Sequence, residues 1–422
     1  MLTTILNQNE FISNYILELN LPYSSAIKNH MVNLISGIIV TEGNKTISSA
    51  YNKLTSNRHR STGSRFLSSY SWNHEYVTEE RIFHAISEIS NTCDDNDVGF
   101  LIIDDTLSKK NTSTKKIEGL DFHNSHADGN KPKWSHCLVT SHYKIKNCSI
   151  PLNFKQYHRK ESSKKLSKKF LDKNELAMEL INEFTPATKI NYLLVDSWYT
   201  SAKILLHGLI NGCHTIGRIK SNRVIYPAGI KTNVGKFSSY IKSNETSVVT
   251  ASNNKYYVYR YEGKLNDIEN AVVLISWNKQ DLSDKPSFII STDVSLDNRT
   301  IISYYEKRWD IEVSYRYHKT ALGFDEFQIQ SLESIHRYWS MIFLTYTFLE
   351  LFRIKYGKLY KFKNIGDVIL HFRNNYLVKI VAFAHECADN EISLKSTISK
   401  LGLVSSIFPI YCTSLVIDIK DE

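Results

Sequence analysis

Two short apolar runs in the sequence are each followed at once by acidic residues. Phe100–Ile103 leads directly into Asp104 and Asp105, and Tyr192–Val195 ends at Asp196. A run of apolar residues closed by polar ones is typical of a buried strand. After the second run, apolar residues recur at the three- and four-residue spacing of a helix. The pattern predicts two buried strands with carboxylates at their ends, the second of which leads into a helix.

Residues 1–90 have the pattern of a helical region. Ser24 and Ser25 can cap a helix whose apolar stripe continues to residue 38, a second helix is predicted from Thr46, and another after Thr78. The polar loop between the last two contains Arg58, Arg60 and Arg65. This arrangement resembles a small helical DNA-binding unit. A helical bundle with a solvated basic loop fits the same residues equally well.

The pattern changes again in residues 212–293, where short β-rich runs alternate with Asn, Ser, Gly and Lys turns. These runs predict an inserted antiparallel β-subdomain. A long helical region follows from residue 303, and then an apolar helix near residues 335–356. The apolar stretch Tyr338–Phe352 is shorter than a membrane span and has arginines on both sides. We therefore expect a buried helix and no membrane.

The composition is that of an ordinary globular protein with a basic bias. The chain has 422 residues, 42% of them hydrophobic and 23% charged, which suggests two or three structural units. Its net charge of +9 suits a polyanionic partner. Residues 105–175 alone carry 16 Lys and Arg against 7 Asp and Glu. A basic loop region is thus predicted beside the first acidic run.

The six cysteines are scattered without CxxC spacing, and no secretory signal precedes them. A reducing cytoplasm is the expected location. His136, Cys137, His142 and Cys148 lie close in sequence but match no standard zinc finger. We interpret them as structural residues.

Two strand-end aspartates and one glutamate on a helix are the ligands that two-metal phosphoryl transfer requires. Asp105, Asp196 and Glu312 fit this pattern, since magnesium prefers hard oxygen ligands. One aspartate at a strand end is more often a helix cap or turn residue. The prediction therefore depends on the third acid.

Glu312 lies in a helical segment with three other polar residues. Tyr305, Arg308, Glu312 and Lys319 follow one another at intervals of three, four and seven residues, which places them on one helical face. Asp310 points about 200° away from Glu312 and is the poorer ligand. Cations beside a carboxylate suit a site shared by a metal and a phosphodiester. For an isolated helix, the spacing of Arg308 and Glu312 is explained equally well by an ordinary surface ion pair, worth about 0.3–0.5 kcal/mol.

These four residues carry a resemblance to a known family. Tyr305-x2-Arg308-x3-Glu312-x6-Lys319 is similar, position for position, to the YREK signature of bacterial insertion-sequence transposases with a DDE active site. The resemblance covers roughly residues 30–350 and includes the segments IDDT, LLVDSWYTS, IGRIKSNR and the passage from STDVSLDN to YEKRW. The third acid follows the second by 116 positions, a gap that accommodates the β-insertion such transposases carry.

The resemblance implies an α/β fold with an RNase H-like mixed-sheet core, an inserted antiparallel β-subdomain and flanking helical regions. It implies that Asp105, Asp196 and Glu312 are catalytic and hold two Mg²⁺ ions, for which Mn²⁺ can substitute. Matching the family's Asp-Thr pair to this sequence favours Asp105, which precedes Thr106, as the first metal ligand. Asp104, which must face the opposite side of the strand, remains the alternative.

The resemblance also implies contacts with DNA. Tyr305, Arg308 and Lys319 are assigned to phosphate contact. In the insertion, Arg218 and Lys220 are the expected DNA-binding residues and Arg223 is a further candidate, although any one of them fits a solvated surface. Trp277 could stack on an extruded base, but a tryptophan in such a β-run is more often part of the core.

The expected activity is metal-dependent DNA cleavage followed by strand transfer, by a cut-and-paste route. Expected partners are double-stranded DNA, as terminal inverted repeats and as target, and a second copy in a homodimer. The predicted domains are a DNA-binding region at 1–90, a catalytic core at 91–211 and 294–375, the insertion at 212–293, and a C-terminal helical region at 376–422 that could dimerise. The alternatives are a transposase-derived DNA-binding protein without catalysis and an RNase H-fold nuclease without strand transfer.

Overall fold

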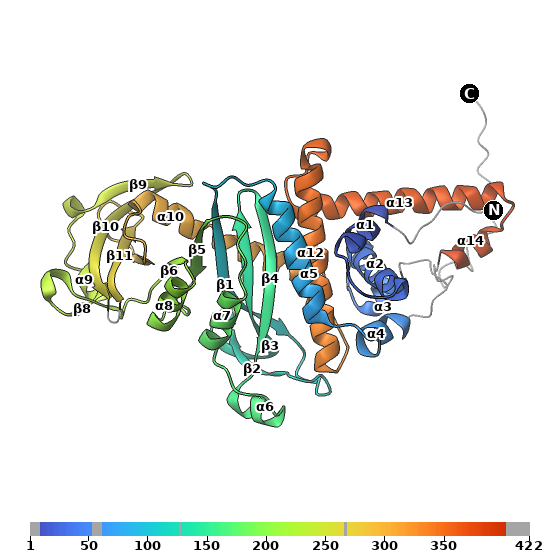
Figure 1. The fold of residues 1–422 in the computed structure, drawn as a ribbon, viewed down its shortest axis with the longest axis horizontal. Coiled ribbons are helices and arrows are strands. Elements are labelled where there is room, and N and C mark those ends of the chain that lie inside the picture. The colour runs from blue at the N-terminus through green and yellow to red at the C-terminus, as the bar shows by residue number, and fades with distance from the viewer. Residues whose placement is uncertain (1–8, 53–60, 126–127, 266–267, 402–422) are drawn as a thin grey trace. The chain divides into compact units, whose positions relative to one another are not determined.

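The computed structural model describes residues 9–52, 61–125, 128–265 and 268–401 (Figure 1). The chain divides into two compact units, one formed by Thr78–Thr320 and the other by Met1–Val77 together with Ala321–Glu422. Arg58 and Arg60 of the predicted basic loop lie outside the described residues, as does the end of the predicted C-terminal region from residue 402.

A ten-stranded mixed sheet forms the Thr78–Thr320 unit, with strand order β2-β3-β1-β5-β6-β12-β11-β10-β9 and β4 paired with β3. Strands β1, β5 and β6 run parallel to one another, and the other pairs are antiparallel. A mixed sheet with helices confirms the predicted α/β, RNase H-like fold class. The strands are β1 (Val98–Lys109), β2 (Asp121–Ser125), β3 (Lys131–Ile145), β4 (Cys148–Tyr157), β5 (Ile190–Val195), β6 (His214–Arg218), β9 (Ser247–Ala251), β10 (Asn254–Leu265), β11 (Ile268–Trp277) and β12 (Ser287–Ser291).

The antiparallel strands β9 to β12 extend the core sheet, because β12 pairs with β6. These antiparallel strands begin after β6. Strand β6 itself lies inside the range predicted for the insertion, but it pairs in parallel with β5. A separate two-stranded sheet, β7 (Val224–Ile225) with β8 (Thr232–Asn233), and the short helix α9 (Val234–Ser238) lie between β6 and β9 in the sequence.

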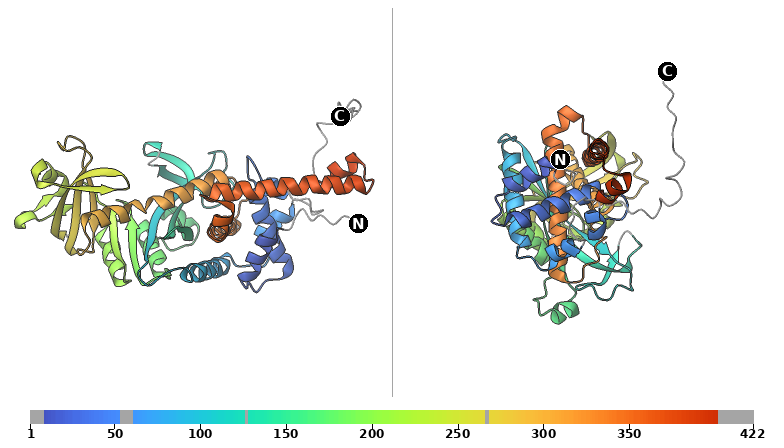
Figure 2. Two further views of the ribbon diagram at one scale, coloured as in Figure 1. Left: turned by 90° about the horizontal axis from the view of Figure 1, so that it is seen from above. Right: turned by 90° about the vertical axis from the view of Figure 1, so that its right-hand side faces the viewer.

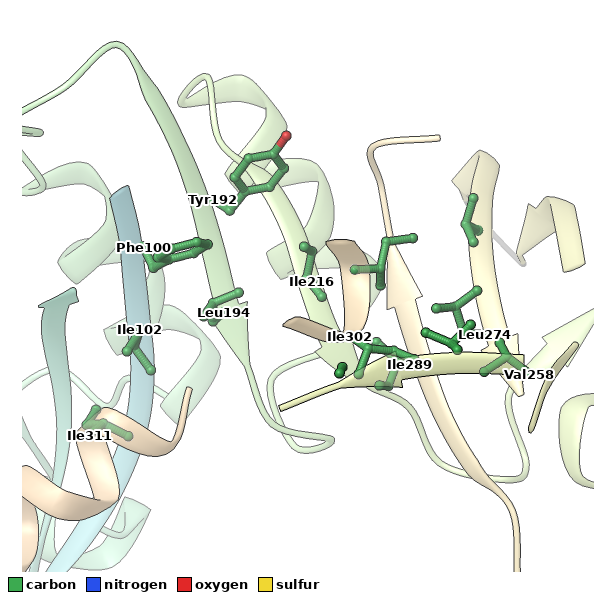
Figure 3. Close-up of a cluster of buried hydrophobic side chains, with 14 of the residues drawn as sticks. Phe100, Ile102, Tyr192, Leu194, Ile216, Val258, Leu274, Ile289, Ile302 and Ile311 are labelled. Carbon is green, nitrogen blue, oxygen red and sulfur yellow. The ribbon is translucent and has the colours of Figure 1, made fainter. Parts of the chain in front are cut away.

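Helices cover both faces of the sheet. On one face, α10 (Asn298–Glu306) and α11 (Trp309–Arg316) bury Ile302 and Ile311 against Ile102 of β1 and Leu194 of β5, in the cluster shown in Figure 3. On the other face, α8 (Ala202–Ile210) contributes Leu205 to a second cluster with β11 and β12. Helices α6 (Lys160–Lys165) and α7 (Lys173–Asn182) connect β4 to β5.

The region predicted as one long helix is interrupted twice. Backbone hydrogen bonds from Lys307 to Tyr304 and from Arg308 to Tyr305 span three residues instead of four, which tightens the chain between α10 and α11. After Arg316 the chain continues as a π-helical turn, Tyr317–Ala321. The prediction that the four YREK-type residues share one face of a regular helix is therefore wrong, because the helical repeat changes on both sides of α11.

The other unit is helical. Its helices are α1 (Glu10–Glu18), α2 (Ser25–Val40), α3 (Ile47–Asn52), α4 (Ser61–Ser68), α12 (Leu332–Tyr360), α13 (Ile365–Asp389) and α14 (Leu394–Lys400). The two longest, α12 and α13, pack with each other and with α2 (Figures 1 and 2). Seventeen residues of α12 are buried, as predicted for the apolar helix near 335–356. None of the described helices combines the length and apolar character needed to cross a membrane.

The caps explain where the N-terminal helices begin. The Ser24 hydroxyl accepts a hydrogen bond from the Ile27 backbone N–H, and Thr46 accepts one from Ser49, so both predicted starts are confirmed. The helix predicted after Thr78 is α5 (His74–Ser90), which begins four residues earlier. The Asn73 side chain caps it by accepting from the backbone N–H groups of Glu75 and Tyr76.

Candidate active site

The prediction that the first strand stops at Asp104 is wrong, because β1 continues through both aspartates to Lys109, paired with β3. Its parallel pairing with β5 does end just before Asp104, which places that residue beside the end of β5. Ile103 and Val195 are the last partners in that ladder, and Asp104 and Asp196 are the residues that follow them. In an α/β sheet the carboxyl ends of neighbouring parallel strands form the edge at which ligands bind.

Asp104 and Asp105 point to opposite faces of the sheet. Alternation along β1 puts Asp104 on the face of Phe100 and Ile102, which α10 and α11 cover. There the Arg308 Nη1 lies 2.8 Å from the Asp104 Oδ2. On the other face, the Asp105 carboxylate accepts hydrogen bonds from Lys173 Nζ at 2.7 Å and from the Tyr199 hydroxyl at 3.0 Å.

Arg308 also connects Asp104 with Glu312. It stands at the N-cap of α11, and its Nη2 lies 3.6 Å from the Glu312 Oε1. The Asp104 side chain is almost fully buried, whereas that of Glu312 is partly exposed. Burial raises the pKa of Asp104 well above its ordinary value, and the negative charges of Asp105, Asp196 and Glu312 act in the same direction against the lowering by Arg308. The guanidinium thus lies among acids that repel one another.

Helix α11 is fixed against β3 by two polar contacts. The Tyr315 and Thr140 hydroxyls are 2.6 Å apart in the interior, and Lys144 Nζ pairs with Asp310 Oδ1 at 3.1 Å. Asp310, which the sequence indicates as the poorer ligand, therefore binds β3. These contacts set the height and rotation at which α11 presents Glu312.

The turn after β5 is organised by Asp196 itself. Its Oδ1 accepts from the backbone N–H groups of Trp198, at 2.8 Å, and of Tyr199, at 3.3 Å. This turn packs on Gly217 of β6, where an added Cβ would lie 2.6 Å from the Thr200 Cγ2 and 3.0 Å from the Val195 carbonyl oxygen. Only glycine allows the two segments to approach this closely.

The other predicted residues are placed as follows. Tyr305, in the last turn of α10, forms a side-chain hydrogen bond with Arg308. Burial raises the pKa of Tyr305, and the positive charges of Arg308 and Arg218 oppose this only in part. Lys220 lies with its Nζ 5.1 Å from the centre of the Trp198 ring. Lys319 lies in the π-helical turn and is partly buried.

Two candidate DNA contacts in the insertion have partners within the protein. Arg223 donates a hydrogen bond to the Thr200 carbonyl oxygen, so its guanidinium supports the turn after β5. Trp277 is only 3% exposed and packs in the second cluster. The interpretation of Trp277 as a core residue, favoured over base stacking, is therefore confirmed.

Lys173, Trp198 and Tyr199 are site residues that the sequence alone did not single out. Trp198 and Tyr199 stand directly in the LLVDSWYTS segment, so the proximity of two aromatic residues to Asp196 was an available signal. Lys173 is 68 positions from its partner Asp105 and is one of many lysines in a basic region. No local pattern distinguishes it.

The chemistry of the donors fits a divalent metal. Asp104, Asp196 and Glu312 supply carboxylate oxygens, the ligands that Mg²⁺ and Mn²⁺ prefer. Among the described residues, no three His, Cys, Asp or Glu side chains lie close enough together to hold an ion as they stand. The Arg308 guanidinium lies between Asp104 and Glu312, so these carboxylates can converge on a metal only if it moves aside.

A mixed sheet with acids where two adjoining parallel strands stop pairing, and with a third acid on a covering helix, is an RNase H-like architecture. Within that class the chain belongs to a transposase family: the family described as "Transposase DDE domain" matches residues 99–348. No curated protein sequence matches the chain.

Proposed function

We propose that this protein cuts and rejoins DNA as a metal-dependent, cut-and-paste transposase of an insertion sequence. The observation that carries the proposal is the grouping of Asp104, Arg308 and Glu312, from β1 and α11, beside the end of β5. Membership in the DDE transposase family supports a DNA substrate and transposition.

We propose Asp104, Asp196 and Glu312 as the metal ligands, in place of the set containing Asp105. Support comes from the side-chain directions: Asp104 shares Arg308 with Glu312, whereas Asp105 is paired with Lys173 on the opposite face. Two Mg²⁺ ions at these carboxylates would supply an activated water and neutralise charge on the phosphodiester.

The basic residues around the acids bind and orient DNA in this proposal. Arg308 exchanges its carboxylate partners for a phosphate oxygen when the acids take up metal, and the Tyr305 hydroxyl keeps the guanidinium oriented. Arg218, the last residue of β6, and Lys220, two residues further on, are exposed and can neutralise further phosphates. Lys319 is assigned to phosphate contact by the YREK resemblance alone. Terminal inverted repeats and target DNA are the proposed partners.

The test is magnesium-dependent excision of the gene's own flanking DNA from a plasmid. We expect Asp104→Asn, Asp196→Asn and Glu312→Gln to abolish cleavage and to leave DNA binding in place. Asp105→Asn is the matched control, since it removes the adjacent carboxylate; it should keep activity within about tenfold, the lower end of what supporting residues of a metal site contribute.

Each alternative has its own outcome. Loss of cleavage in Asp105→Asn with full activity in Asp104→Asn would reverse the ligand assignment. Cleaved ends without joined products would indicate a nuclease. Binding without cleavage by the wild type, in Mg²⁺ and in Mn²⁺, would indicate a DNA-binding protein without catalysis.

A further inference from the structure

The sheet continues past the acidic residues as a projection beyond the end of β5. Parallel pairing of β1 with β5 ends at Ile103, but β1 continues to Lys109 in its pairing with β3. Lys109 follows Asp104 by five residues, a rise of about 17 Å along the strand. The projection consists of this end of β1, the part of β3 that faces it, and the strands β2 and β4 on the other side of β3.

Helix α6 lies at the end of this projection. Tyr157, the last residue of β4, is level with Leu107 of β1, because both residues pair with Cys137 of β3. Helix α6 begins three residues after Tyr157, and Figure 1 shows it beyond this end of the sheet. It is fastened to β2, since the Ser162 hydroxyl donates to the Asp121 Oδ2 at 2.7 Å. The helix therefore has a defined place on the sheet that carries Asp104.

The projection has a strongly basic surface. Residues 160–169, which include α6, contain five lysines and one acid, Glu161. More exposed lysines lie at the same end of the sheet, in the connection from β1 to β2 and at the start of β3. The Trp134 indole, which donates to the Thr114 carbonyl oxygen at 3.2 Å, holds that connection against β3. The exposed lysines of this surface are Lys115, Lys116, Lys131, Lys160, Lys164, Lys165, Lys168 and Lys169.

This surface suits the phosphate backbone of DNA and is poor in groups that read bases. Lysine is a point charge on a flexible stem, and it contacts phosphates whatever the sequence between them. Bases are read mainly by the paired donors and acceptors of Arg, Asn and Gln. Residues 155–172 contain no Asn, and their only Arg, Arg159, lies 3.6 Å from Asp121. Their only Gln, Gln156, donates to the Gly119 carbonyl oxygen at 3.2 Å.

We infer that α6 and the lysines around it bind target DNA, the duplex into which the cut end is inserted. The inference rests on the proposed function for the joining reaction. The ends of an element have to be recognised by sequence, whereas a target has to be held through contacts that depend little on sequence. A duplex lying along the projection extends toward the acids, because the projection begins at Asp104.

The first test measures binding of the full chain, in EDTA, to a duplex of about 30 base pairs of random sequence at several salt concentrations. For Lys164→Gln/Lys165→Gln we expect the slope of log affinity against log salt to become shallower by about 1.8, or about 0.9 for each phosphate contact. The matched control is Lys146→Gln/Lys189→Gln, which changes the net charge equally at the opposite end of the sheet, after β3 and before β5. This control and Lys164→Arg/Lys165→Arg, which keeps the charge, should bind as the wild type does.

The second test separates target DNA from the element's own ends. A pre-cut element end is joined to a plasmid in Mg²⁺, and cleavage of an uncut end is measured in parallel. We expect Lys164→Gln/Lys165→Gln to lower joining on the order of tenfold at physiological salt, while cleavage continues at the wild-type rate. An unchanged salt slope would overturn the inference, and so would an equal loss of cleavage and joining, which would assign the surface to the element's ends. The proposed function fails separately, if the wild type neither cleaves nor joins DNA in Mg²⁺ or Mn²⁺.

Discussion

Replacing Lys173 by methionine should destabilise the Thr78–Thr320 unit, because it leaves the Asp105 carboxylate with a weaker set of partners. The two side chains are 21% and 22% exposed and their charged atoms are 2.7 Å apart. Breaking a fully buried pair is worth about 3–5 kcal/mol, whereas exposed pairs contribute about 0–1 kcal/mol. This pair is mostly buried, and the Tyr199 hydroxyl remains as a donor to Asp105. We therefore expect a coupling free energy of about 2 kcal/mol between the two residues.

The measurement is a double-mutant cycle of Lys173→Met and Asp105→Asn in urea unfolding, followed by tryptophan fluorescence. Lys189 and Asp95 provide the matched control, because their charged atoms are 2.6 Å apart but their side chains are 75% and 76% exposed. That pair should couple by no more than about 0.5 kcal/mol. A coupling as small as the control's would show that Asp105 is not anchored by Lys173, and the case for Asp104 as the ligand would lose its main support.

Three other outcomes are expected. Gly217→Ala should lower the unfolding temperature and reduce cleavage, because the new Cβ meets the turn at Thr200; we expect a loss of about 1–3 kcal/mol in thermal unfolding, and unchanged stability would contradict the close approach. Lys319→Ala should weaken DNA binding and reduce its salt dependence, as measured by affinity at several salt concentrations; an unchanged slope would remove Lys319 from the phosphate contacts. Acid should destabilise the sheet, because burial lowers the pKa of His123, His136 and His158 from 6.5 to about 4, so that the unfolded chain takes up protons first as the pH falls. The stability that depends on these neutral histidines is fully present above pH 6.5 and is lost toward pH 4, by about 1 kcal/mol per histidine at pH 5.5. An equal unfolding temperature at pH 7.5 and 5.5 would refute this.

The two buried strands could be predicted because the signal is local: a run of apolar residues marks the buried part of a strand. The same reasoning located β5, which ends just before Asp196, and the buried start of β1. It misplaced the end of β1, which continues through Asp104 and Asp105 because β3 supplies hydrogen-bond partners as far as Lys109. Helix starts at Ser24 and Thr46 were equally accessible, since a capping side chain bonds a backbone group within three residues.

The choice between Asp104 and Asp105 needed information that is not local. Alternation along a strand separates the two side chains but does not say which face α10 and α11 cover. That depends on packing of Ile302 and Ile311, about 200 positions away. The sequence likewise predicted one regular helix through the YREK-type residues. In the structure the hydrogen-bond spacing of the helix shortens before α11 and lengthens after it.

The adjacent aspartates within β1 are tolerated because each has its own cation on its own face. Arg308 neutralises Asp104 on one side of the sheet, and Lys173 neutralises Asp105 on the other. The two ion pairs differ in the other contacts that each cation makes. Arg308 also contacts Glu312, so displacement of the Arg308 guanidinium would free two carboxylates on one face. A phosphate group could then neutralise the guanidinium there. Lys173 holds a single carboxylate among Tyr199 and Cys137, in a compact network behind the sheet. In the proposed mechanism the first pair opens when metal binds and the second stays closed, so that the two neighbouring acids have different functions.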